Sequence, residues 1–170
     1  MRTFIFILLS VPSFLFSQTS AVFIKLTDAK GTPVNGDVVT RGFEKSIRAL
    51  TLSNTGKNNT QLNFTMPVTG AGAALKSAMA GNEQLLNATV FVMVNGMNGT
   101  LQTSYTIKME RISVVSCSES MGCNNAMTTA VTLQATRIGW TYYTTDRAGN
   151  TTVSQKYGFD AATGKPWTNF

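Results

Sequence analysis

The chain has 170 residues, with 14 Lys and Arg against 8 Asp and Glu, and it contains no histidine. The missing histidine excludes the Ser-His-Asp and Cys-His arrangements for nucleophilic catalysis and removes the commonest general base. The net charge of +6 is spread along the chain without a run of Lys and Arg, so the composition does not indicate a nucleic-acid-binding protein.

The first 17 residues, MRTFIFILLSVPSFLFS, have the pattern of a secretory signal peptide. Arg2 precedes an apolar run that is too short to span a bilayer, and small residues follow it. We expect cleavage after Ser17, with Ala21 as the alternative site; an uncleaved N-terminal anchor is the competing interpretation. Residues 18–170 then form a single domain. The mature protein is expected in the periplasm or outside the cell, without a membrane span.

Short strand patterns occupy the first part of this domain. Phe23–Leu26 is typical of a strand, and Arg41–Leu52 of one or two strands, with the turn AKGTPVNGD between them. The polar segment 53–60, SNTGKNNT, predicts a loop, and Gln61–Met66 predicts another short strand.

A single helix is predicted at Gly70–Ala80, after Pro67 and with Gly81 placed to end it. Its apolar face consists of Ala71, Leu75, Ala78 and Met79. Ala88–Val94 follows as a strand, and the turn NGMNG joins it in a hairpin to the next strand.

Two long strand patterns come next, and each changes face partway along. In YTIKMERISVVS, residues 105–116, the apolar positions shift beyond Arg111 from Tyr105, Ile107 and Met109 to Ile112 and Val114. In AVTLQATRIGWTYY, residues 130–143, they shift from Val131, Leu133 and Ala135 to Ile138, Trp140 and Tyr142.

Such a phase change indicates either a β-bulge or a sheet with apolar groups on both faces. With two apolar faces, one meets the protein's own core and the other meets another subunit. We expect Trp140 in the core, because a packed barrel needs its bulkiest ring inside. The subunit interface is expected at one or more of Val131, Leu133 and Ala135. A stacking platform for sugars or bases, made of Trp140, Tyr142 and Tyr143, is the alternative to packing in the core or in a subunit interface.

No catalytic, metal-binding or phosphate-binding motif is found, so no catalytic residue, cofactor or metal is expected. Cys117 and Cys123 lie in the loop CSESMGC, and in an exported chain we expect them to form a local disulfide. Closing such a short loop contributes ~2 kcal/mol in the chain-entropy model. Two thiolates without histidine are too few ligands for zinc.

Many short strands with one helix indicate a mainly β fold, a barrel or a sandwich. The order KMERISVVSCS, TTAVTLQATRIGWTYY and VSQKYGFD resembles the C-terminal half of the Hcp family, the ring-forming tube proteins of type VI secretion. FIKLTDAKG at Phe23–Gly31 is similar to the first strand and turn of that family, and KSIRALTLS at Lys45–Ser53 stands where its second strand would be. The resemblance extends from about Val22 to Phe159.

This resemblance implies a small β-barrel with one short α-helix packed at its side. It also implies a non-enzymatic structural protein that forms hexameric rings able to stack into tubes, with segment 53–60 facing the next ring. Partners are then other copies of the chain, with secretion-apparatus or effector proteins as further partners.

Tube subunits of the family are made without a leader peptide, so this chain is expected to be an exported relative that keeps the fold and the ring. Two other functions remain: a secreted adhesin or carbohydrate-binding module, and, more weakly, a small secreted hydrolase or toxin.

Overall fold

The structure is a computed structural model that describes residues 20–96, 99–121, 125–146 and 148–170. The expected signal peptide, residues 1–17, and Cys123 lie outside these ranges. The described residues form one sheet of nine strands, one α-helix and a short 3-10 helix, Lys57–Asn59. The strands and α-helix are β1 (Ser20–Thr27), β2 (Ile47–Ala49), β3 (Thr51–Thr55), β4 (Gln61–Pro67), α1 (Gly70–Ala80), β5 (Leu85–Asn95), β6 (Leu101–Met121), β7 (Met127–Thr145), β8 (Thr151–Asp160) and β9 (Lys165–Pro166).

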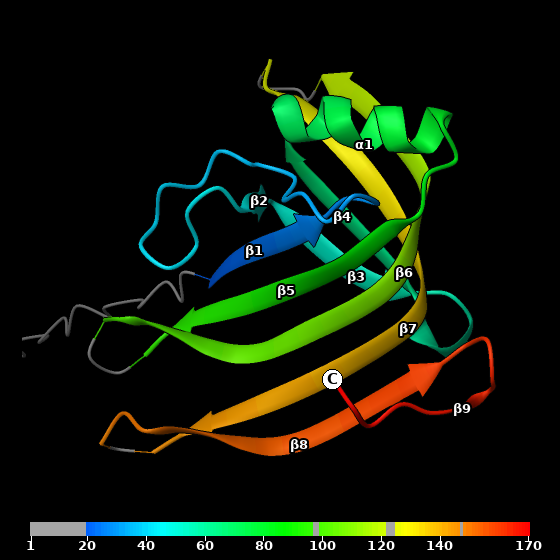
Figure 1. The fold of residues 1–170 in the computed structure, drawn as a ribbon. Coiled ribbons are helices and arrows are strands. Elements are labelled where there is room, and N and C mark those ends of the chain that lie inside the picture. The colour runs from blue at the N-terminus through cyan, green and yellow to red at the C-terminus, as the bar shows by residue number, and fades with distance from the viewer. Residues whose placement is uncertain (1–19, 97–98, 122–124, 147) are drawn as a thin grey trace, which may run out of the picture.

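The sheet curls around its core, and its two ends meet at a corner in the chain. The pairing order is β2-β1-β5-β6-β7-β4-β3, and β8 also pairs with β7. β2 and β3 stand at opposite ends of this order, yet only Leu50 separates them. One pairs with β1 and the other with β4, so the segment 47–55 bridges the two ends of the sheet. This is the expected mainly β architecture, with α1 lying across one end (Figure 1).

The phase change in β6 and β7 is a shared bend that keeps one apolar face in one core. Glu110 pairs with Arg137 and Ile112 with Ala135, so each strand places two consecutive residues between its inward-facing positions. Arg111 adopts a left-handed conformation there, with φ 52°. A second irregularity between Val114 and Ser116 returns Cys117 to the core. Irregularities of this kind let a strand bend while its side chains stay on the required face.

The expectation of two apolar faces is therefore wrong. Its alternative, a bulge, applies only between Val114 and Ser116, where the register shifts; at Arg111 both strands change face together and stay in register. Val131, Leu133 and Ala135 face the same core as Ile138 and Trp140. Their side chains are almost completely buried within this protomer, so they do not present a surface to another subunit. The expectation that Trp140 packs in the core is confirmed.

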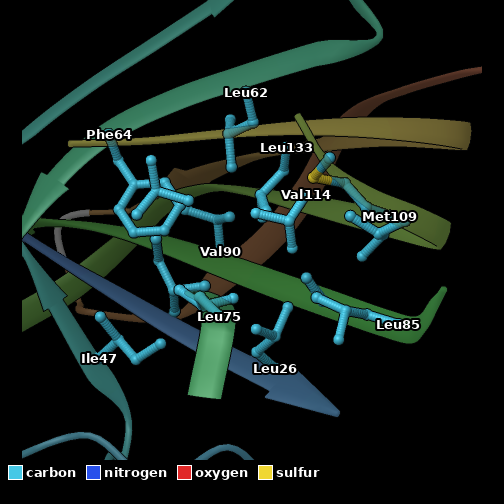
Figure 2. Close-up of a cluster of buried hydrophobic side chains, with 14 of the residues drawn as sticks. Leu26, Ile47, Leu62, Phe64, Leu75, Leu85, Val90, Met109, Val114 and Leu133 are labelled. Atoms are coloured by element: carbon cyan, nitrogen blue, oxygen red, sulfur yellow. The ribbon is translucent and has the colours of Figure 1, made fainter. Parts of the chain in front are cut away.

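Helix α1 covers one end of the core and has the bounds that the sequence predicts. Its inward residues include Ala71, Leu75 and Ala78, and Figure 2 shows Leu75 among the strand side chains of the core. The helix ends in a Schellman motif, in which Asn82 donates to the carbonyl of Met79 and Glu83 to that of Ala78. The left-handed residue is Asn82, with φ 50°, whereas Gly81 is the last residue before it and has φ −78°.

A smaller apolar cluster lies on the outer face of β1 and β5. Phe43, from the loop between β1 and β2, stacks on Phe23 with ring centroids 4.6 Å apart and meets Phe91 edge-on at 5.2 Å. The segment 41–46, expected to begin a strand, forms turns that hold this loop over the sheet. Within the described ranges, no helix has the length and apolar character needed to cross a membrane.

Candidate assembly interface

The apolar face of the core continues onto a part of the sheet that no described segment of the chain covers. β7 pairs along its first half with β4 and along its second half with β8, so β8 extends the sheet away from α1 (Figure 1). One row of paired residues follows this face across five strands: the exposed fraction is 0% for Ile24, 0% for Val90, 1% for Ile107, 7% for Trp140 and 57% for Tyr157. The core face thus becomes a surface at β8.

Four aromatic residues lie where the buried core ends and the uncovered surface begins, and we name them the aromatic rim: Tyr105, Trp140, Tyr142 and Tyr157. Trp140 is buried in the core, whereas Tyr142 and Tyr157 are exposed. The Trp140 and Tyr157 rings stack with centroids 5.6 Å apart, and those of Tyr105 and Tyr142 are also 5.6 Å apart. Tyr142 is 43% exposed, while burial, and then the neighbouring Tyr142, raises the pKa of Tyr105. Rings with an apolar body and a polar tip are the usual anchors of protein interfaces.

The backbone of β8 adds a second feature that favours association. β8 pairs with β7 along one side, and on the other side β9 pairs only with Phe159 and Asp160. Along Thr151–Tyr157 no strand in the described part of the chain occupies that second edge, and these seven residues are all exposed. An unpaired edge of this length is a template for a strand from another chain.

Charged side chains fix the base of β8 at the bend of β6 and β7. Arg137 donates from Nε to Asp160 Oδ2 at 2.8 Å and lies 3.5 Å from Glu110. Asp160 Oδ1 also accepts from the backbone N–H groups of Ala162 and Thr163, which closes the turn after β8. The hydrogen bond from Arg137 is the main cause that lowers the pKa of Asp160. We call the curled, enclosed part of the sheet the barrel, and β8 with the second half of β7 the extension. These hydrogen bonds and ion pairs attach the extension to the barrel at its base.

Cys117, which the sequence analysis also singled out, is not part of the aromatic rim. The thiol of Cys117 is buried under α1 and donates to the carbonyl of Gly72 at 3.8 Å. Burial is the main cause that raises its pKa. Because Cys123 lies outside the described residues, the disulfide stays a prediction.

The described residues contain no group of three or more His, Cys, Asp or Glu side chains that could hold a metal ion. Asp28 and Glu83 line the same surface hollow, about 450 Å³, beside α1. Asp28, however, accepts hydrogen bonds from the backbone of Lys30 and Thr32 and so serves a turn.

Sequence reasoning missed Tyr105 and Tyr157 as surface residues of the apolar face. The segment QKYGF was identified as a strand, but a strand of five residues does not show which of its faces is apolar. The apolar residues that pair with Tyr105 and Tyr157 in the neighbouring strands indicate which face they share. Identifying these partners required the register of the sheet.

Comparisons with known proteins agree with this architecture. The model of the family described as "Type VI secretion system effector, Hcp" matches residues 23–142. Hcp1 from Salmonella typhimurium has 18% identity and a TM-score of 0.71, with 87% of this chain and 99% of that chain covered. Hcp1 from the E. coli EAEC 042 pathovar has 20% identity and a TM-score of 0.67, with 83% and 98% covered.

A third structure, described as that of a type six secretion system protein, has 18% identity and a TM-score of 0.72, with 88% of this chain and 100% of that chain covered. At identities this low, the likeness to solved structures concerns the fold. Among curated proteins, none matches the sequence.

Proposed function

Because this chain belongs to the Hcp family of type VI secretion proteins, we propose that it is a non-enzymatic structural protein that assembles with copies of itself into a ring. The observation that carries the proposal is the aromatic rim, where a row that is buried in four strands ends on the exposed Tyr157 of β8. Six protomers are expected, as in the family that the sequence resembles.

Tyr157 of the aromatic rim and the free edge belong to the same strand, β8, and can act together. A neighbouring protomer that covers Tyr142 and Tyr157 would bury an apolar surface now in water, and the backbone edge at Thr151–Tyr157 would fix the direction of approach. The rim of one protomer meets a different surface of the next, so the interface is heterologous and the rotation closes a ring. A stable contact of this kind buries ~800 Å² on each partner.

The mass of residues 18–170 in solution tests the ring. We expect light scattering to give several times the protomer mass at micromolar concentration. Replacing Tyr157 by Lys places a charge in the centre of the contact and should raise the dissociation constant roughly 30-fold or more, the ~2 kcal/mol of an interface anchor. The unfolding temperature of the isolated protomer should change little, because Tyr157 is already 57% exposed.

Val39→Lys is the matched control, because Val39 is apolar and 90% exposed but lies in the loop between β1 and β2. It should leave the assembled mass unchanged. A wild-type chain that stays monomeric at high micromolar concentration would refute the ring. Equal losses of mass in the two variants would show that added charge, rather than the rim, is responsible.

Exposure of Tyr142 and Tyr157 also supports the alternative of a carbohydrate-binding module, since tyrosine rings stack on sugars as well as on protein. Glycan binding by a monomer, lost in Tyr157→Ala, would favour this alternative over the ring.

Export of the chain by its leader completes the proposal, with 18–170 as the mature domain. The N-terminal residue of the protein recovered outside the cytoplasm tests it. Gln18 would agree with cleavage after Ser17, and an intact Met1 would contradict a removable leader.

A further inference from the structure

The chain after β8 folds back over the outer face of β7 and β8, opposite the aromatic rim. A tight turn follows Asp160, and β9 then pairs with the end of β8. Trp167 donates from its backbone N–H to the carbonyl of Gly158 at 2.9 Å, and its side chain is 8% exposed. Figure 1 shows this C-terminal segment lying against the two strands.

Two facing glycines form a slot for the last ring of this segment. Gly139 of β7 and Gly158 of β8 pair directly in the sheet. A Cβ atom at Gly139 would lie 2.6 Å from the Phe170 ring, and one at Gly158 would lie 2.5 Å from it. Neither glycine has the positive φ that would itself require glycine. Their common role is to let the ring approach the backbone of both strands.

Lys156 and Trp167 hold the ring in this slot. Lys156 Nζ donates to the backbone carbonyl of Phe170 and lies 4.4 Å from the centre of its ring. The rings of Trp167 and Phe170 are in contact, with centroids 4.8 Å apart. The segment therefore connects the outer face of β8 to β7 through side chains, in addition to the backbone ladder.

We propose that Trp167 and Phe170 are positioning residues for assembly, which hold β8 in the orientation that presents Tyr157 and its free edge to a second copy of the chain. This inference rests on the proposed ring. Within the extension, β8 lies at the edge of the sheet: in the described part of the chain, Thr151–Tyr157 pairs only with β7, and its inner face is uncovered. From Tyr143 onward β7 no longer pairs with β6, so the tip of the extension is a two-stranded ribbon, which is only marginally stable in water. The C-terminal segment packs on the outer face of that extension, away from the main core, so its loss should change β8 more than the barrel.

Phe170→Ala and Gly139→Ala test the slot from its two sides. The first removes the ring, and the second places a methyl group where the ring lies. We expect each to raise the dissociation constant of the ring at least tenfold, while the unfolding temperature of the diluted protomer falls by only a few degrees. In the double variant the effects should not add, because the methyl group displaces nothing once the ring is absent.

Amide hydrogen exchange of the protomer gives a second measurement. In Phe170→Ala, the β8 amides that pair with β7 should exchange at least tenfold faster, while those of β5 keep their wild-type rates. Phe43→Ala is the matched control: it removes a phenyl ring from the outer face of β1 and β5, and it should leave both the β8 amides and the assembly unchanged.

The outcomes separate the two proposals. If the wild-type chain forms rings and Phe170→Ala forms them with the same affinity, the positioning role is refuted and the ring stands. Unchanged β8 exchange in Phe170→Ala also refutes the positioning role. If the wild-type chain is monomeric, the ring is refuted and the positioning role with it.

Discussion

Individual side chains in this protein have opposite roles at positions that look alike in the sequence. Leu133 and Tyr157 both occupy inward-facing positions of strands, but Leu133 is completely buried and Tyr157 is mostly exposed. The difference arises because the curled sheet and α1 enclose the first half of β7, whereas β8 lies outside the enclosed part. A substitution at the first position therefore tests folding, and one at the second tests association.

Leu133→Ala should lower the free energy of unfolding by about 2–5 kcal/mol, the usual cost of emptying a buried leucine site. The folded variant should associate with wild-type affinity, because Leu133 has no access to a partner. Urea unfolding at a concentration where the protein is monomeric measures the first effect, and light scattering measures the second. Val115→Ala, at an exposed bulge residue of β6, is the control and should change neither. Loss of assembly in a fully stable Leu133→Ala would instead make Leu133 an interface residue.

Cys117 should be oxidised to a disulfide with Cys123 in the exported protein. The non-reduced mature chain would then be two hydrogen atoms lighter than the reduced chain by mass spectrometry. In the reduced protein the thiol should react slowly with alkylating reagents, since burial raises its pKa and lowers the fraction of thiolate. A free thiol in exported material would contradict the disulfide, and fast alkylation of the folded protein would contradict the burial of Cys117.

At the scale of elements, the bend shared by β6 and β7 connects the barrel to its extension. The two strands change face at the same place, so the ladder between them stays in register on both sides of Arg111. Arg137 lies at this bend and bridges Glu110 of β6 and Asp160 of β8. The orientation of β8 thus depends on charged side chains at its base and on the C-terminal segment along its outer face.

Acid should weaken the attachment of β8 through Asp160. Because Arg137 lowers the pKa of Asp160 in the folded state, this carboxylate favours folding above its ordinary pKa of about 3.9, and the contribution is lost as the pH falls through the lowered value. The unfolding temperature of the wild type should therefore fall more steeply below about pH 4 than that of Asp160→Asn. Parallel pH profiles for the two proteins would disagree with this role.

At the scale of the whole molecule, the sheet separates an enclosed core from an open extension. The enclosed part holds α1 and the bridge from β2 to β3, and it is stable through burial of its apolar face. The extension has an apolar inner face and a free edge, and the C-terminal segment packs on the base of its outer face; this is the arrangement expected of an edge strand that a neighbouring protomer completes.

Ring formation should make the thermal stability depend on protein concentration. Association removes folded protomers from the unfolding equilibrium, so the unfolding temperature should rise with concentration above the dissociation constant. Scanning calorimetry over a hundredfold range of concentration measures this rise. Tyr157→Lys should move the onset of this rise to a concentration roughly 30-fold or more higher, whereas an onset unchanged from the wild type would place the interface elsewhere.

The sequence by itself determined the mainly β fold with one helix, and it located that helix at Gly70–Ala80, because local features such as Pro67 and the apolar spacing of Leu75 and Ala78 are read directly from the chain. It also indicated the bend near Arg111, where the alternation of side chains is interrupted.

Only the tertiary structure decided which apolar residues are enclosed. Val131, Leu133 and Ala135 alternate as a half-exposed strand would, but they are buried by α1 and by strands distant in the sequence. The aromatic rim and the slot for Phe170 were likewise decided by the pairing of β6, β7 and β8. Burial depends on which segments meet in space, and alternation within one strand carries no information about what lies opposite.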